Sequence, residues 1–197
     1  MNDPDTPRYP WAALLQTMSS GIDHDLYIDK DLSSYPSEWL GTTPATEAEI
    51  LRQEERLGHR LPPSYREFLQ VSNGWDVNSS TSLHILPIAE VGWTRDVDPH
   101  LAHSWGPAPG SPIPKLPDDY FFDYDAPQNE DYFDGGDFLP HTLCVSENVE
   151  GAVYLLNPHV VTSGDEWEAW YLDTSYMLGA TRFRSFWHLL EKAFRRH

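Results

Sequence analysis

The sequence predicts an α+β fold: a single domain with an N-terminal helix pair, a central antiparallel sheet of about four to six strands, and a C-terminal helix packed on the sheet. Three observations predict it. Residues 44–75 have the spacing and the cap residues of two short helices. Short apolar stretches at 141–146, 152–156 and 166–172 are joined by short loops, which favours antiparallel pairing. Residues 186–194 place apolar side chains on one helical face.

Length and composition fit one domain. The 197 residues, 40% of them hydrophobic, are enough to bury roughly 70% of the unfolded chain's surface. No apolar run approaches the ~20 residues of a membrane-spanning helix, and residues 1–10 lack the pattern of a signal peptide. Cys144 is the only cysteine, so no intramolecular disulfide can form. We therefore expect a cytoplasmic protein.

The charge is strongly acidic. The formal net charge is −18, from 31 acidic and 13 basic residues. This argues against direct contact with nucleic acid, which needs a basic surface, and against docking on anionic lipid. It favours basic protein partners, although solubility accounts for the bulk of the charge equally well.

Residues 1–43 are predicted to be an N-terminal extension, and the domain proper to span residues 44–197. Apolar residues 11–15 predict a short helix that packs on the domain. We expect the rest of the extension to be an irregular segment that wraps over the surface.

The first helix of the predicted pair has a signal at each end. Thr46 can cap its N-terminus while Glu49 reaches back, which is a capping box. Gly58 follows Leu57, where a left-handed C-terminal cap is expected.

The second helix starts at a proline corner. Pro62 and Pro63 cannot continue a helix but can begin one. Leu61 precedes this corner. The residues predicted to fall on one helical face are Tyr65, Phe68, Leu69 and Ser72, and those predicted to stop the helix are Asn73 and Gly74.

The strands follow further along the chain. Residues 83–88 predict a strand at a sheet edge, and residues 141–146 predict a second. Residues 152–156 predict a third, stopped by Asn157-Pro158, and residues 166–172 predict a fourth. Ser185 is then expected to cap the last helix, whose apolar face is formed by Phe186, Leu189, Leu190, Ala193 and Phe194.

Residues 93–138 carry few helix or strand signals, and residues 106–114 are dense in glycine and proline. Compact domains rarely keep so long a connection unless it is functional or disordered. We therefore predict a loop insert at about 93–138.

This insert holds an acidic, aromatic tract without a lysine or arginine. Its acids are Asp118, Asp119, Asp123, Asp125, Glu130, Asp131, Asp134 and Asp137. Its rings include Tyr120, Phe121, Phe122, Tyr124, Tyr132, Phe133 and Phe138. Charge repulsion is expected to keep the tract extended or exposed unless a cation or a basic partner neutralises it.

Three interpretations of the tract stay open. It is a docking surface for a basic protein, in which the acids steer and the rings supply affinity. Alternatively Asp131, Asp134 and Asp137 bind calcium, although their spacing does not match a calcium loop. The third interpretation is a solvated loop whose rings pack back on the domain.

We find no catalytic constellation. Cys144 lies in mid-strand with no charged neighbour and is expected to be a small core residue. His100 and His103 have helical spacing but lack the third or fourth ligand that zinc needs. We therefore predict a protein that is not an enzyme and uses neither a metal nor a cofactor.

A family resemblance lies in the helix pair. Glu49-Ile50, residues 55–58, residues 61–69 and Ser72-Asn73-Gly74 resemble the signature of the SUKH superfamily, in the Smi/Knr subgroup named after a fungal cell-wall assembly regulator. The resemblance extends over roughly residues 44–92 and 138–194. It implies the order helix pair, strand, variable insert, strand meander and a helix opened by Ser-Phe.

The resemblance also implies a function. Bacterial members imply an immunity protein that binds and neutralises a toxin domain, and an acidic blocker suits a basic, nuclease-type toxin. Fungal members imply the alternative, a regulatory scaffold. In either case the residues expected to contact the partner are Asp118, Asp119, Tyr120, Asp123, Tyr124, Asp125, Glu130, Asp131, Asp134 and Asp137.

Overall fold

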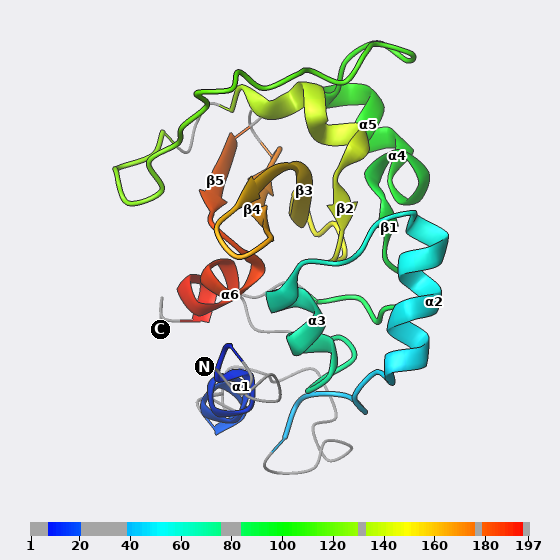
Figure 1. The fold of residues 1–197 in the computed structure, drawn as a ribbon, viewed down its shortest axis with the longest axis vertical. Helices are drawn as coiled ribbons and strands as arrows, with labels where there is room; N and C mark the ends of the chain where they lie inside the picture. The colour runs from blue at the N-terminus through cyan, green and yellow to red at the C-terminus, as the bar shows by residue number, and fades with distance from the viewer. Residues whose placement is uncertain (1–7, 21–38, 76–83, 130–132, 176–178, 195–197) are drawn as a thin grey trace.

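Five antiparallel strands form one sheet in the order of the chain (Figure 1). They are β1 (Gly92–Trp93), β2 (Leu143–Cys144), β3 (Ala152–Thr162), β4 (Glu166–Asp173) and β5 (Gly179–Phe183). The computed structural model describes residues 8–20, 39–75, 84–129, 133–175 and 179–194. The α+β class and the number of strands are confirmed.

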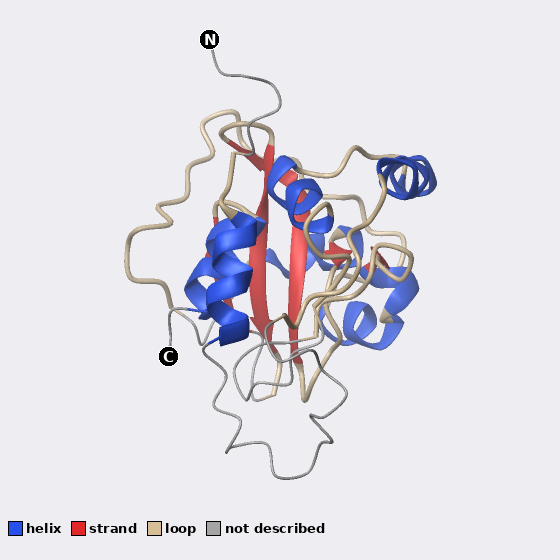
Figure 2. Cartoon of the chain, turned by 90° about the horizontal axis from the view of Figure 1, so that it is seen from below, coloured by secondary structure: helices blue, strands red, loops and turns tan. Residues whose placement is uncertain are grey.

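Apolar side chains cover both faces of the sheet. Side chains on a strand alternate between faces, so Leu155 and Leu156 point to opposite sides and enter two different cores. Helices accordingly flank the strands on both sides (Figure 2). When a sheet is covered on both faces, the sequences of its strands are nearly continuous runs of apolar residues.

The first face packs against α1 (Trp11–Ser20), α2 (Glu47–Leu57), α3 (Pro63–Leu69) and α6 (Phe186–Phe194). The helix predicted at residues 11–15 is present and buries Trp11 and Leu15. The predicted C-terminal helix begins directly after Ser185, and the side chain of Phe194 lies outside the described part. Aromatic rings connect three of the helices through the contacts Trp11–Phe68, Trp11–Phe186, Tyr65–Phe186 and Phe68–Phe186.

The caps of the helix pair match the sequence pattern. The Glu49 backbone N–H donates to Thr46 Oγ1 (3.3 Å), and the Thr46 backbone N–H donates to Glu49 Oε2 (2.7 Å). Gly58 ends α2 with a φ of 70°. Arg66 of α3 then forms ion pairs with Glu47 and Glu54 of α2, which holds the two helices together.

The predicted stop at Asn73-Gly74 is wrong, because α3 already ends at Leu69. These residues fasten the loop that follows instead. Asn73 Oδ1 accepts a hydrogen bond from the Ile88 backbone N–H (2.7 Å). Gly74 has a φ of 97° and lies so close to Ile85 that an added Cβ would be 2.8 Å from its carbonyl oxygen.

The second face of the sheet is covered by the segment that the sequence predicts to be a loop. It contains β1, α4 (Thr94–Val97), α5 (Pro99–Trp105) and the 3-10 helix η3 (Gly135–His141). Residues 93–105 and 135–138 therefore contain regular elements that were not predicted, whereas the described residues 106–129 contain neither a helix nor a strand. Short helices such as these gain their stability from packing on the sheet and leave a weak local signal.

The strand boundaries also differ from the predicted ones. Of residues 83–88, Leu83 lies outside the described part, and Ile85 forms only isolated bridges, to Trp75 and Ser146. The strand predicted at 141–146 is reduced to β2, and β3 continues past Asn157-Pro158 through an irregularity in its pairing with β4. Strand β5 was not predicted, because its five residues carry no strong alternation.

Candidate protein-binding surface

Part of the acidic tract runs beside the edge strand β5. Gln128 fastens it there: its Nε2 donates to the Arg182 carbonyl oxygen, and its Oε1 accepts from the Arg182 backbone N–H, both at 2.8 Å. A side-chain amide thus takes the place of a neighbouring strand. Such a cover protects an edge strand from pairing with another chain.

A buried carboxylate anchors this segment. Glu168 on β4 is fully buried, and its oxygens accept hydrogen bonds from the Tyr124 hydroxyl (2.9 Å), the Trp170 indole (2.6 Å) and Arg182 Nε (2.8 Å). Burial and the Glu168 carboxylate both raise the pKa of Tyr124, so its hydroxyl keeps the proton that it donates. A buried carboxylate of this kind needs its charge compensated, which Arg182 does.

Arg182 is in turn enclosed by rings of the acidic segment. Its guanidinium lies 3.8 Å from the Phe122 ring centroid and 6.0 Å from that of Tyr120, and it also bonds the Tyr120 hydroxyl. Cation–π contacts of a desolvated arginine are worth about 2 kcal/mol. The inward row of the segment, Tyr120, Phe122 and Tyr124, therefore holds the segment on the sheet.

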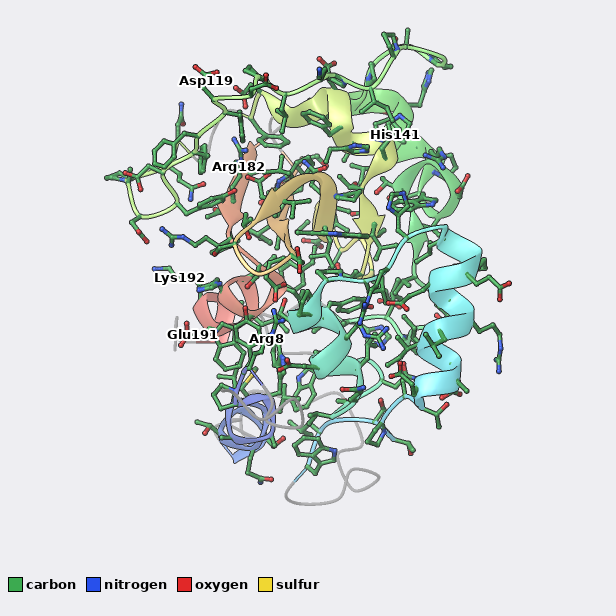
Figure 3. All side chains as sticks on the ribbon, in the orientation of Figure 1. Arg8, Asp119, His141, Arg182, Glu191 and Lys192 are labelled. Atoms are coloured by element: carbon green, nitrogen blue, oxygen red, sulfur yellow. The ribbon has the colours of Figure 1, made fainter. Side chains whose placement is uncertain are left out.

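The residues between these rings point outward. Phe121 is 81% exposed, and Asp119 and Asp123 on either side of it are also exposed. We call Asp119, Phe121 and Asp123 the acidic row. In Figure 3, Asp119 lies on the outer side of the segment and Arg182 on its sheet side. The alternation is that of an extended chain, so one set of side chains fixes the other in place.

The remaining predicted contact residues differ in their environment. Asp118 is exposed, whereas Asp125 binds Arg184 through two hydrogen bonds (2.9 and 2.5 Å), and the hydrogen bond from Arg184 lowers the pKa of Asp125. Asp134 and Asp137 are exposed at the start of η3. Glu130 and Asp131 lie outside the described residues. Asp131 is one of the three predicted calcium ligands, so that site is described only in part.

Of the predicted tract, the structure packs on the sheet the side chains of Tyr120, Phe122, Tyr124, Gln128, Phe133 and Phe138. The partners Glu168, Arg182 and Arg184 were missed, because their roles depend on pairing between β4 and β5. A glutamate inside the ring-rich run 166–172 was the available signal, since a charge there needs a partner.

Other candidate groups are placed as follows. Cys144 is buried in the sheet, and burial raises the pKa of its thiol to about 12. Within the residues that the structure describes, no group of three or more histidine, cysteine, aspartate or glutamate side chains could hold a metal ion. Among the same residues, no helix is long and apolar enough to cross a membrane.

The helix pair buries the residues of its predicted signature that belong to the proline corner and to α3, namely Leu61, Pro62, Tyr65, Phe68 and Leu69.

The fold is that of an α+β domain with exposed acidic and aromatic side chains beside its edge strand. A family model described as the SMI1 / KNR4 family (SUKH-1) matches residues 44–192, and the chain belongs to this family. At the level of the family this means an immunity-type or regulatory role through a protein partner, generally without catalysis. A comparison with curated proteins finds no significant match.

Proposed function

We propose that this chain is an immunity protein, which binds a cognate basic, nuclease-type toxin domain and blocks its active site by occlusion. The observation that carries the proposal is the acidic row, held outward by rings that pack on Arg182. A surface ordered before binding loses less conformational entropy on association than a free loop would. The protein itself performs no chemistry in this mechanism.

The charges of the acidic row favour a basic partner. Within the described part of the chain, neither Asp118 nor Asp119 takes part in an ion pair, so both stay available to a partner. The net charge of −18 adds a long-range attraction. Electrostatic attraction of this kind acts mainly on the association rate and on partner choice.

The ring of Phe121 supplies the apolar part of the contact. Large rings that become desolvated in the centre of an interface carry much of its binding energy. Tyr120 and Tyr124 differ from it, because their hydroxyls are engaged with Arg182 and Glu168. We assign these two residues to positioning the segment and Asp119, Phe121 and Asp123 to the contact itself.

Co-expression with a toxin domain encoded beside this protein tests the proposal. The wild-type protein is expected to restore growth, and the variant Asp119→Lys/Asp123→Lys to lose most of that protection. The variant Glu90→Lys/Glu150→Lys changes the net charge equally at exposed positions elsewhere and is expected to protect. Death of cells that express folded wild-type protein would exclude immunity against that toxin. Full protection by the Asp119→Lys/Asp123→Lys variant would place the interface elsewhere.

A further inference from the structure

The sheet has a notch on the side of β3 that faces β2. Strand β2 pairs with Leu155 and Leu156 alone, whereas β3 continues to Thr162. Among the described residues, Val161 and Thr162 pair with β4 and have no strand on their other side, whereas residues 158–160 form an irregularity that pairs with neither strand and is partly covered by Phe138 of η3. Val161, in this stretch, is 59% exposed. An uncovered strand edge can receive an extended segment of another chain.

Aromatic rings from several elements surround this notch. The ring of His59, after α2, lies 5.3 Å from that of Trp93 on β1 and 6.0 Å from that of Trp167 on β4. The rings of His141 and His159 lie 6.0 Å apart, at the end of η3 and on β3. His59 is the exposed member of the first group, whereas the ring of Trp167 is buried beneath it.

Cationic groups accompany the rings. Arg95 lies over Trp93, 5.8 Å from its centroid, and its Nη1 is 2.9 Å from His141 Nδ1. Arg60, next to His59 in the chain, forms no ion pair or hydrogen bond with any residue that the structure describes. Arg60 and Trp167 also line an open groove of about 1300 Å³, together with Arg8 and Val161.

Of the carboxylates near these groups, Glu47 and Glu54 pair with Arg66, and Glu55 is exposed beside His59 and Arg60. Asp96 lies 3.8 Å from Arg95 Nε, at the limit of an ion pair. The carboxylate of Glu67 accepts hydrogen bonds from the backbone N–H groups of Arg8 (3.1 Å) and Tyr9 (3.0 Å). Asp165 is the remaining acid along the groove. In a chain of net charge −18, this surface is an exception.

The pKa shifts of His141 and His159 agree with basic surroundings. Burial lowers the pKa of both His141 and His159. Arg95 lowers that of His141 further, and His141 and His59 lower that of His159. The charged groups that act on these rings are therefore themselves basic.

We propose that this surface is a docking strip for an extended segment of a partner protein in which carboxylates alternate with aromatic or aliphatic side chains. We call it the basic strip, and it consists of Arg8, His59, Arg60, Trp93, Arg95, His141, His159 and Trp167. The exposed rings of the strip offer apolar contact and the arginines offer charge to such a segment. The edge of β3 adds few backbone donors, because Pro158 has no N–H and the His159 N–H donates to Asn157 Oδ1.

The basic strip is separate from the acidic row. In Figure 3, His141 and Arg8 both lie well away from Asp119. The two surfaces have opposite charge and therefore attract different partners. A protein with both can bind a second partner while the acidic row is engaged, and this inference does not rest on the proposed immunity function.

The test uses a fluorescent peptide of alternating aspartate and phenylalanine as a probe, and fluorescence anisotropy as the readout. The full chain is expected to bind this peptide more tightly than a counterpart with lysine in place of aspartate. The variant Arg60→Glu/Arg95→Glu should weaken binding about tenfold or more, because it reverses two of the three arginine charges of the strip. The control Arg52→Glu/Lys192→Glu changes the net charge equally on α2 and α6, at exposed positions outside the strip, and should bind like wild type.

Three outcomes would overturn the proposal. Equal loss in the control variant would mean general charge attraction, and equal binding of the lysine peptide would remove the preference for carboxylates. Sedimentation of the wild-type chain as an oligomer that Arg60→Glu/Arg95→Glu dissociates would show that a second copy occupies the strip. All four substituted positions are exposed, so both variants are expected to fold. Thermal melts of the two variants check this.

Discussion

Arg182 on β5 directs its guanidinium at the fully buried carboxylate of Glu168 on β4, with Nη2 and Nε at 2.6 and 2.8 Å from Oε1. This pair links the two strands farthest from β1 and supports the rings of Tyr120, Phe122 and Tyr124 above it. The acidic row on the outside of the protein thus depends on a charge pair beneath it.

Removing either partner of this pair should destabilise the protein. Glu168→Leu leaves a largely buried guanidinium without its counter-charge, and Arg182→Met leaves a buried carboxylate, so each should lower the free energy of unfolding by about 3–5 kcal/mol. The double variant should lose less than the sum of the two, because no unpaired charge remains. Urea unfolding of the three variants measures this. Additive losses would mean that the two side chains do not act as a pair.

Gly74 and Gly58 should respond differently to alanine although both have positive φ. An alanine at Gly58 (φ 70°) meets no atom within 4 Å, so it should cost only the backbone strain of about 1 kcal/mol. An alanine at Gly74 would place its Cβ 2.8 Å from the Ile85 carbonyl oxygen, so it should cost about 3 kcal/mol. Thermal or chemical unfolding of the two variants compares them directly, and equal losses would contradict the tight approach of Ile85.

Neutralising the acidic row should slow binding to a basic toxin domain. Asp119→Asn/Asp123→Asn should reduce the association rate constant by up to about tenfold at low salt, with a smaller change in dissociation, because exposed charges act mainly on diffusional encounter. The matched control is Glu90→Gln/Glu150→Gln, which removes two exposed charges elsewhere. Stopped-flow or surface plasmon resonance measurements at several salt concentrations supply the rates. A rate that keeps its wild-type salt dependence would count against steering by the row.

A fall in pH should lower the folding stability of the protein through protonation of His141. Arginine can only donate, so Arg95 requires Nδ1 of His141 to be an unprotonated acceptor. Burial and then Arg95 lower the pKa of His141 below its usual value. The unfolded chain therefore takes up this proton at a higher pH than the folded chain does. The contribution of this site to stability is complete above about pH 6.5 and is lost as the pH falls through the folded-state pKa.

The variant Arg95→Gln tests this assignment. It removes the positive charge next to His141 and leaves the neighbouring His159 in place, so the pKa of His141 should rise. An NMR titration of the histidine ring protons reads this directly, and unfolding at about pH 7.5 and about pH 5.5 should show a smaller loss of stability in acid than in wild type. An unchanged pKa would mean that burial alone sets it.

Local sequence is sufficient to predict the features whose causes lie within one or two helical turns. The capping box of Thr46 and Glu49, the left-handed Gly58 and the apolar face of α6 each follow from residues three or four positions apart, so they could be predicted. The strand at residues 166–172 was predicted from its own local run of aromatic and apolar residues. The family resemblance in residues 44–75 was confirmed by the family match.

The packing of the acidic tract depends on contacts that are distant in the sequence. Its rings find Arg182 and Glu168 about 50 residues later in the chain, and such pairing has no local signal. The short helices α4, α5 and η3 form because they cover an apolar face of the sheet, which the sequence around them does not reveal. The basic strip likewise depends on tertiary structure, because its residues come from six segments that are separate in the sequence.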